Sequence, residues 1–302
     1  MNILKTEDKH AILIQCHNKP EIVNFLIENL PSEHFDFYIH VDKKSDIFDK
    51  IVRKKNVIFS KRIDVRWGRV SQIEATLALF EDIKGKYLYV HLISGLDFLV
   101  KSPKEFIDFF KKAEGKQYIQ SNPLPEKSTW SWGGMDRVCV YHPQFIIRRP
   151  TNKFWKFIRV GWREFVMRTK FLKRKRQPVN KFYGGSSWFS LTGECVQWIK
   201  EYLKAHPNYL RFFKNTVCGD EIFFSTIVRY SPFSDQIVNE PLRFMKWRNT
   251  TNGGPAEIKE EDFTHMINSI HVFARKFTSV QIIKKYLEFY NNEKNEKDCK
   301  KF

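Results

Sequence analysis

The sequence predicts an α/β protein in which a central, mostly parallel sheet is flanked by helices. Short apolar runs typical of buried strands alternate with segments whose apolar residues recur at helical spacing. Such alternation places helices on the faces of a parallel sheet. The chain has 302 residues, 42% of them hydrophobic, so it is long enough to bury a large core. We therefore expect a globular α/β protein, folded as one large domain or two small ones.

The predicted strands and helices follow one another through the first half of the chain. Apolar runs short enough for buried strands occur at residues 11–15, 37–41, 57–59 and 87–93. Apolar residues at helical spacing follow the first strand. Two later helices are predicted to start at capping boxes, formed by Ser71 with Glu74 and by Ser102 with Glu105.

Parallel sheets bind ligands outside the carboxyl ends of their strands. Three segments fit this rule: Asp42 after the second strand, Trp67-Gly68-Arg69 before a helix, and Ser94 to Asp97 after the fourth strand. The carboxylate of Asp42 can accept hydrogen bonds from a base or a ribose. The alternative is that Asp42 and Asp97 are turn residues, because Asp side chains bond readily to nearby backbone.

The pair Asp220-Glu221 opens an apolar run and predicts the start of a helix. With Asp220 as the capping residue, the Glu221 carboxylate lies beside unpaired backbone N–H groups and the positive end of the helix dipole. A carboxylate placed there can act as a general base. Cations that can hold an anionic substrate follow: Arg243, Lys246, Arg248, Arg275 and Lys276. Together these residues suggest group transfer from a phosphate ester. The alternative is an ordinary capped helix.

Two aromatic segments also suggest a binding site. Residues 183–189, Tyr-Gly-Gly-Ser-Ser-Trp-Phe, join a glycine and serine turn to an aromatic strand, as expected where backbone approaches a ligand closely. In a strand, Arg243, Met245 and Trp247 share one face. A cation and an indole on one wall suit a phosphate and a sugar ring, and an amphipathic edge strand is the alternative.

The chain is strongly basic, with 52 Lys and Arg against 34 Asp and Glu and a formal charge of +18, which favours anionic partners. In the densest basic stretch, Arg148 to Lys181, Lys and Arg alternate with Trp and Phe at helical spacing. This pattern is typical of an interfacial membrane helix, and it equally fits a solvated helix that packs its aromatics into the domain. The chain shows no recognised nucleic-acid module, so no nucleic-acid partner is expected.

Absent motifs disfavour several classes of protein. The sequence has no G-x-G-x-x-G and no Walker-type loop, which argues against dinucleotide and P-loop cofactors. Its five cysteines never form C-x-x-C and its histidines lack the spacings of metal motifs, so no metal site is predicted. No run approaches the roughly 18 apolar residues of a membrane span, and residues 1–9 lack the regions of a signal peptide, so a cytoplasmic location is expected.

Taken in order, seven segments resemble glycosyltransferase family 14, which contains the core-2/I-branching β-1,6-N-acetylglucosaminyltransferases and the peptide O-xylosyltransferases. The segments are residues 11–17, 39–42, 67–70, 92–98, 185–189, 220–221 and 273–277. The resemblance implies a GT-A-like, Rossmann-like fold, inverting transfer from a UDP-sugar, and no required metal, in agreement with the absence of D-x-D. It also implies one transferase domain over residues 1–292, with a nucleotide-sugar half at about 1–120, an acceptor and catalytic half at about 121–292, and a charged tail at 293–302.

The resemblance implies roles for particular residues, with Glu221 as the catalytic base. The residues that hold the donor diphosphate are Lys276, Arg243, Arg275 and Arg248. The residues of the nucleoside pocket are His17, Asp42, Trp67, Arg69 and Val70. The residues of the sugar pocket are Ser94, Asp97, Gly185, Ser186, Ser187, Trp188, Asp220 and Trp247. Ser187 stands where xylosyltransferases carry an aspartate in Gly-Ser-Asp-Trp-Phe, which disfavours xylosyl transfer. N-acetylglucosamine is the leading sugar, and xylose, glucose and glucuronic acid are the alternatives.

The implied partners are a UDP-sugar donor and a glycan or lipid-linked glycan acceptor, with no cofactor. Eukaryotic relatives carry an amino-terminal membrane helix, and this chain resembles a bacterial-type cytoplasmic member. We expect the stretch from Arg148 to Lys181 to contact an anionic membrane at its inner face. One rival is a basic protein that binds nucleic acid or a membrane surface without transferase activity. The other, a glycoside hydrolase, needs a second carboxylate, for which Asp97 and Asp136 are candidates.

Overall fold

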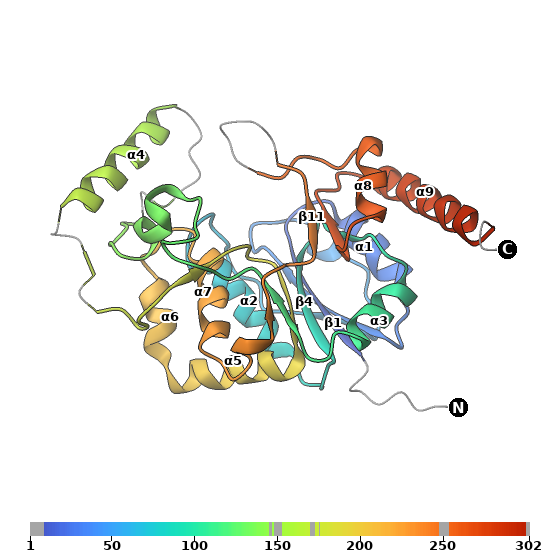
Figure 1. Ribbon diagram of the computed structural model, residues 1–302, viewed down its shortest axis with the longest axis horizontal. Coiled ribbons are helices and arrows are strands. Elements are labelled where there is room, and N and C mark those ends of the chain that lie inside the picture. The colour runs from blue at the N-terminus through green and yellow to red at the C-terminus, as the bar shows by residue number, and fades with distance from the viewer. Residues whose placement is uncertain are drawn as a thin grey trace. The chain divides into compact units, whose positions relative to one another are not determined.

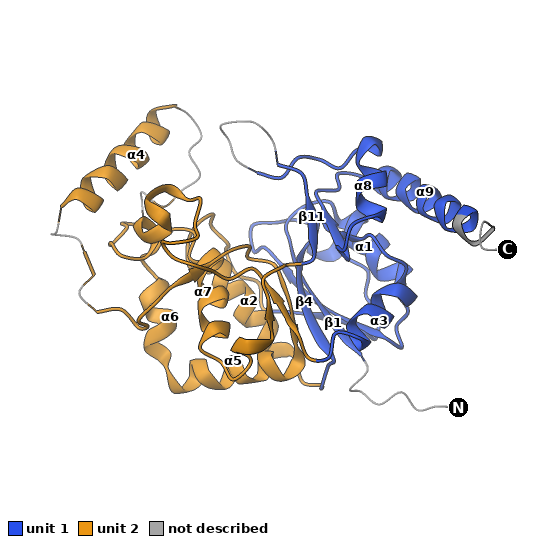
Figure 2. Ribbon diagram, viewed as in Figure 1, with its two compact units in different colours: residues 1–60, 86–114, 242–302 blue, residues 61–85, 115–241 orange. Residues whose placement is uncertain are grey.

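The computed structural model describes residues 9–144, 147, 153–169, 173–174, 176–247 and 254–299. The chain forms two compact units, coloured separately in Figure 2. Unit 1 contains residues 1–60, 86–114 and 242–302, and unit 2 contains residues 61–85 and 115–241. Each unit is thus assembled from separate stretches of sequence. A single transferase domain divided near residue 120 stays a prediction.

The core of unit 1 is a set of parallel strands in the order β4-β1-β2-β3. They are β1 (His10–Cys16), β2 (Phe35–Val41), β3 (Val57–Phe59) and β4 (Tyr89–Ser94). Almost every residue of β1, β2 and β4 is buried, as expected for parallel strands covered on both faces. The strands predicted at 11–15, 37–41, 57–59 and 87–93 are therefore confirmed.

Helices and a second, smaller sheet complete unit 1 (Figure 1). The helices are α1 (Pro20–Asn29), η2 (Phe48–Lys50), α3 (Pro103–Lys111), η5 (Glu260–Asp262), α8 (Phe263–Ile267) and α9 (Val280–Cys299). The smaller sheet has the order β11-β12-β5, formed by Arg243–Met245, Phe273–Arg275 and Phe98–Leu99. The capping box at Ser102 is confirmed, because its hydroxyl accepts the Glu105 backbone N–H at 3.2 Å and the Glu105 side chain bonds back to the Ser102 N–H.

Unit 2 combines several helices with short strands. Its helices are α2 (Ser71–Asp82), η3 (Ser131–Arg137), α4 (Lys153–Arg168), α5 (Gly193–Ala205), α6 (Pro207–Phe213), α7 (Asp220–Arg229) and η4 (Ser234–Gln236). Strand β6 (Gln117–Ile119) pairs parallel with β10 (Ile237–Val238) and antiparallel with β9 (Phe189–Thr192). A separate antiparallel pair joins β7 (Asn122–Pro123) to β8 (Tyr183–Gly184).

The capping box predicted at Ser71 is wrong. Helix α2 is preceded by Val70 as its cap residue, and no side chain caps it. The Ser71 hydroxyl instead accepts the backbone N–H of Arg66 at 2.8 Å, so it stabilises the turn before the helix.

The arrangement confirms the predicted α/β class, with mostly parallel strands flanked by helices. Within the described residues, no helix is both long enough and apolar enough to span a lipid bilayer. Cysteines 16, 139, 195 and 218 are all unpaired, as expected from their scattered positions.

Candidate active site

Helix α7 begins at Asp220, and the residue that precedes it, Gly219, provides no side-chain cap. The prediction that Asp220 caps this helix is therefore wrong by one position. The physical reason is that the Asp220 carboxylate already accepts a hydrogen bond from the Ser187 hydroxyl at 2.7 Å. Gly219 is needed for close packing, because a Cβ there would lie 2.5 Å from the Thr216 hydroxyl oxygen.

The side chain of Glu221 lies in the first turn of α7 and is 36% exposed. Its carboxylate forms an ion pair and hydrogen bond with the guanidinium of Arg137 from η3. That guanidinium is also centred 3.7 Å from the ring of Trp130. Arg137 thus orients the Glu221 carboxylate, which stays partly accessible to solvent.

Arg137 is a site residue that the sequence reasoning missed. The segment Trp130-Ser-Trp-Gly-Gly-Met-Asp-Arg137 resembles neither a strand nor a regular helix, and only Asp136 was considered from it. Two glycines and Trp132 adopt positive φ angles there, which bends the chain so that Trp130 and Arg137 stack. An arginine after an irregular segment rich in glycine and tryptophan was the available signal.

Asp220 and Glu221 are neighbouring carboxylates in different environments. Burial and, to a lesser extent, the negative charge of Glu221 together raise the pKa of Asp220 to about 6. Asp136, also in this unit, is buried with its carboxylate 3.9 Å from the Arg163 guanidinium, and burial raises its pKa as well. The Glu221 side chain, 36% exposed and paired with Arg137, is the carboxylate of this group that we consider suited to meet a substrate.

The structure brings the glycine and serine turn to the start of α7. The N–H of Gly185 donates to the Glu221 carbonyl at 2.9 Å, and Ser187 bonds to Asp220 as described. A Cβ at Gly185 would lie 2.3 Å from the carbonyl oxygen of Gln120, so this glycine is explained by contact between two backbone segments. The same Gln120 accepts the Ser186 N–H through its side chain, and the Ser186 hydroxyl accepts the Trp188 N–H.

Three predicted nucleoside-binding residues also belong to unit 2, immediately before α2. Trp67 is 44% exposed, and the Arg159 guanidinium lies 5.4 Å from its ring centre. Arg69 donates to the carbonyls of Gln144 and Ile147, the latter at 3.0 Å, so its guanidinium braces a neighbouring loop. Val70 contributes its carbonyl, which accepts the Glu74 N–H in the first turn of α2.

The other predicted nucleoside residues, His17 and Asp42, lie at the carboxyl edge of the unit 1 strands. Cys16 pairs with Val41 at the ends of β1 and β2, so the residues that follow are neighbours at the same edge. Asp42 accepts the backbone N–H of Lys44 at 3.0 Å, which is the turn geometry considered as its alternative. His17 is exposed, and its carbonyl accepts the Ser45 hydroxyl at 2.8 Å.

Ser94, the last residue of β4, and Asp97, which follows the strand, occupy the same edge. The Ser94 hydroxyl donates to Asp97 at 2.6 Å, and the Arg275 guanidinium lies 3.5 Å from that carboxylate, whose side chain is fully buried. Between them, Gly95 packs so tightly that a Cβ would lie 2.5 Å from the Cβ of Cys16. Asp97 thus links this turn to Arg275 at the end of β12.

The predicted diphosphate cations differ in their surroundings within unit 1. Arg243 is buried, donating to the Leu92 carbonyl at 3.0 Å with its guanidinium 4.2 Å from the Phe273 ring centre. Lys276, half-buried after β12, forms no ion pair with any described residue. Arg248, the remaining predicted diphosphate residue, lies outside the described residues. Trp247, predicted for the sugar pocket, is 64% exposed.

Lys246, a further member of the cationic group, is exposed and paired. Its ammonium group contacts the carboxylates of Glu261 at 2.8 Å and Asp262 at 2.9 Å. Its charge is therefore neutralised by the protein, whereas no described carboxylate forms an ion pair with Lys276.

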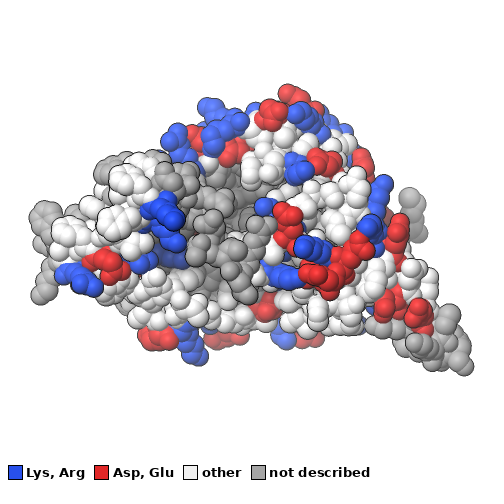
Figure 3. Space-filling view, turned by 90° about the horizontal axis from the view of Figure 1, so that it is seen from above, with Lys and Arg blue, Asp and Glu red and all other residues white. Residues whose placement is uncertain are grey.

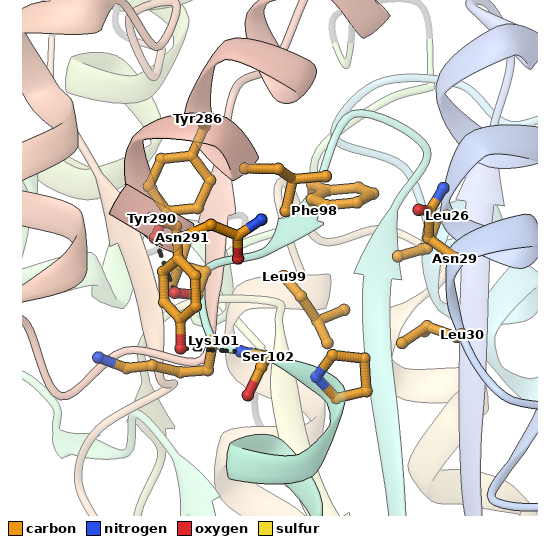
Figure 4. A pocket seen from close by; sticks show the side chains of 13 residues that line it. Leu26, Asn29, Leu30, Phe98, Leu99, Lys101, Ser102, Tyr286, Tyr290 and Asn291 are labelled. Atoms are coloured by element: carbon orange, nitrogen blue, oxygen red, sulfur yellow. Dashed lines mark hydrogen bonds between the residues drawn. The ribbon is translucent and has the colours of Figure 1, made fainter. Parts of the chain in front are cut away.

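Unit 1 contains a cavity of about 130 Å³ bounded by α1, β5, the start of α3, and α9 (Figure 4). Its lining is mostly apolar, with Leu26, Phe98 and Tyr286 among the side chains that surround it. None of the predicted site residues lines this cavity. Elsewhere among the described residues, no group of three or more His, Cys, Asp or Glu side chains is arranged to hold a metal ion; metal independence stays a prediction.

Comparison with known proteins adds an independent finding. A family model described as Core-2/I-Branching enzyme matches residues 24–267. The chain is 24% identical over 241 residues to "Xylosyltransferase oxt" of Drosophila pseudoobscura pseudoobscura, covering 75% of this chain and 24% of that protein. It is also 24% identical over 287 residues to "Xylosyltransferase 2" of Rattus norvegicus, covering 85% and 30% of the two chains. The chain thus spans 24–30% of the length of these relatives.

Solved structures show a weaker likeness. Mouse xyloside xylosyltransferase 1 in its apo form matches with 12% identity and a TM-score of 0.41, covering 88% of this chain and 96% of that one.

Proposed function

Because the chain belongs to the Core-2/I-Branching enzyme family, we propose that it is an inverting, metal-independent glycosyltransferase that moves a sugar from a UDP-sugar to a hydroxyl of a glycan acceptor. The observation that carries the proposal is the accessible Glu221 carboxylate, oriented by Arg137 at the start of α7. A transferase of this kind needs one such base, whereas a hydrolase needs a second facing carboxylate. Asp97 and Asp136, the candidates for that second role, are both buried.

In the proposed reaction, Glu221 accepts the proton of the acceptor hydroxyl. The acceptor oxygen forms a bond to the anomeric carbon as the bond from that carbon to the diphosphate breaks in line. UDP leaves with the electron pair of the broken bond, and prepositioned cations stabilise its developing negative charge. Lys276 is proposed for this role because no described carboxylate neutralises it. Arg243, Arg275 and Arg248 are proposed as further diphosphate residues.

N-acetylglucosamine is the proposed sugar, since Ser187 replaces the aspartate of the xylosyltransferase motif. Xylose is the second candidate, because the curated relatives reported above are xylosyltransferases. The proposed acceptor is a glycan or a lipid-linked glycan. A lipid-linked acceptor would require the protein to work at a membrane surface.

The experiment that tests the proposal is calorimetric titration with UDP-N-acetylglucosamine, UDP-xylose and UDP-glucose, each with EDTA present. We expect one donor to bind without metal and this binding to be lost in Lys276→Ala. Lys246→Ala is the matched control, since its ammonium is already paired with Glu261 and Asp262 and its removal should leave binding nearly unchanged. Absence of binding by any donor, or equal losses in the two variants, would contradict the proposal.

A further inference from the structure

Helix α4 presents an aromatic face to solvent. Phe154, Phe157 and Phe165 are 64%, 77% and 57% exposed. Together with Gly161 they follow helical spacing, so they form one continuous stripe along the helix. A Cβ built on Gly161 would meet nothing within 4 Å, which confirms that the stripe faces open space. Large apolar side chains gathered in this way mark an interaction surface.

The opposite face of α4 packs on unit 2 through both apolar side chains and arginines, with Trp155 and Trp162 half-buried. Val166 is fully buried, and beside it the Arg163 guanidinium lies 3.9 Å from Asp136. One turn earlier, Arg159 lies over the Trp67 ring. An ordinary surface helix buries its apolar face and exposes its charges. Here the arginines point inward and the phenylalanines outward, so the alternative in which the aromatics pack into the domain is wrong for these three residues.

Positive charge surrounds the aromatic stripe. Helix α4 carries five Lys and Arg residues and a single acidic residue, Glu164. Lys153, Lys156 and Arg168 are exposed. The Glu164 carboxylate accepts a hydrogen bond from the Trp132 indole N–H at 3.1 Å and forms ion pairs with Arg163 and Arg168. At the left of Figure 3, uncharged side chains of this region lie at the surface beside Lys and Arg. A partner that fits this surface must therefore provide both an apolar region that can bury the phenylalanines and negative charge for the surrounding cations.

We propose that α4 is an interfacial helix that docks unit 2 on a membrane containing anionic lipid. Phe154, Phe157 and Phe165 enter the boundary between head groups and acyl chains, while Lys153 and Lys156 contact lipid phosphates. A second copy of the chain is a poorer partner, because joining two α4 faces would bring two clusters of positive charge together. The docking does not depend on the proposed glycosyl transfer, and it can be tested without any donor or acceptor.

The test is flotation of the full chain with vesicles of phosphatidylglycerol and phosphatidylcholine in equal parts, and with vesicles of phosphatidylcholine alone. The parent should bind the anionic vesicles, and rising salt should weaken binding. Replacing all three residues (Phe154→Ser, Phe157→Ser, Phe165→Ser) should abolish it, since each inserted phenylalanine contributes roughly tenfold or more in affinity. Ile270→Ser is the matched control, because Ile270 is 66% exposed in unit 1 and should not affect binding.

A second pair of variants tests the charge. Lys153→Gln with Lys156→Gln should weaken binding to anionic vesicles by roughly 25-fold at low salt, about fivefold for each cation. Lys104→Gln with Lys204→Gln removes the same charge from exposed positions on α3's first turn and α5, and should leave affinity within about twofold. Far-ultraviolet circular dichroism of each variant shows whether it is folded.

Several outcomes would overturn the proposal. They are failure of the parent to bind anionic vesicles, equal binding by the parent and the triple serine variant, and equal losses in the α4 charge variant and its control. Concentration-dependent dimerisation that only the serine variant lacks, without vesicle binding by the parent, would assign the stripe to a second copy instead.

Discussion

Replacing Glu221 by glutamine separates the chemistry of the proposed base from its structural contacts. The Gly185 N–H bonds to the Glu221 main-chain carbonyl at 2.9 Å, so this contact survives the substitution. A glutamine side-chain oxygen can also still accept a hydrogen bond from Arg137. What disappears is the negative charge and the ability to take a proton. We expect the rate of transfer to fall by about 10²-fold or more, equivalent to roughly 3 kcal/mol of activation free energy.

The same substitution should have a modest effect on stability. Loss of a negative charge in the first turn of α7 costs about 0.5 kcal/mol through the helix dipole. Replacing the ionic hydrogen bond to Arg137 by a neutral one costs roughly 1 kcal/mol more. Glu194→Gln is the matched control, because Glu194 is likewise the second residue of its helix, α5, and is exposed. Glu194→Gln should lower the free energy of unfolding only by the contribution of the helix dipole, and it should keep full activity.

The assay is release of UDP in the presence of acceptor, together with calorimetric binding of UDP and denaturation by urea. The expected pattern for Glu221→Gln is preserved UDP binding, a free energy of unfolding lowered by about 1–2 kcal/mol, and little turnover. Turnover within tenfold of the parent would refute the assignment of Glu221 as base. Lost UDP binding would indicate instead that the substitution had disturbed the site.

Two further predictions concern stability. Burial raises the pKa of Asp220 from 3.8 to about 6, so the folded protein holds this proton more tightly than the unfolded chain and loses stability as pH rises through that interval. Between pH 5 and pH 7 the free energy of unfolding of the parent should therefore fall by about 1 kcal/mol more than that of Asp220→Asn, as measured by urea denaturation of both proteins. Identical pH dependence of the two proteins would show that Asp220 does not titrate in this range. At the start of α3, Ser102→Ala should lower the free energy of unfolding by about 1 kcal/mol, because it removes the side chain that caps the Glu105 N–H. Ser102→Thr keeps a hydroxyl at this position and should retain most of the parent's stability. Equal stability of Ser102→Ala and the parent would contradict the capping role.

The sequence by itself determined where most elements lie in unit 1 and where α7 begins to within one residue. Buried strands and amphipathic helices have different periods, and those periods are local properties of the chain. The capping box at Ser102 could be predicted for the same reason, since its partners are three residues apart. The box at Ser71 failed because a competing backbone donor, the Arg66 N–H, takes its hydroxyl.

Only the tertiary structure decided which side chains meet. Arg137 and Glu221 are 84 positions apart, and no local pattern encodes their pairing. Arg243 and Lys276 looked alike as downstream cations, yet packing buries Arg243 against Phe273 and leaves Lys276 half-buried without an ion pair to any described residue. The helical spacing of Trp and Phe between Arg148 and Lys181 likewise left two orientations of the aromatic side chains open. Which face turned toward solvent depended on the partners that unit 2 supplies to Arg159 and Arg163, and those contacts exist only once the chain has folded.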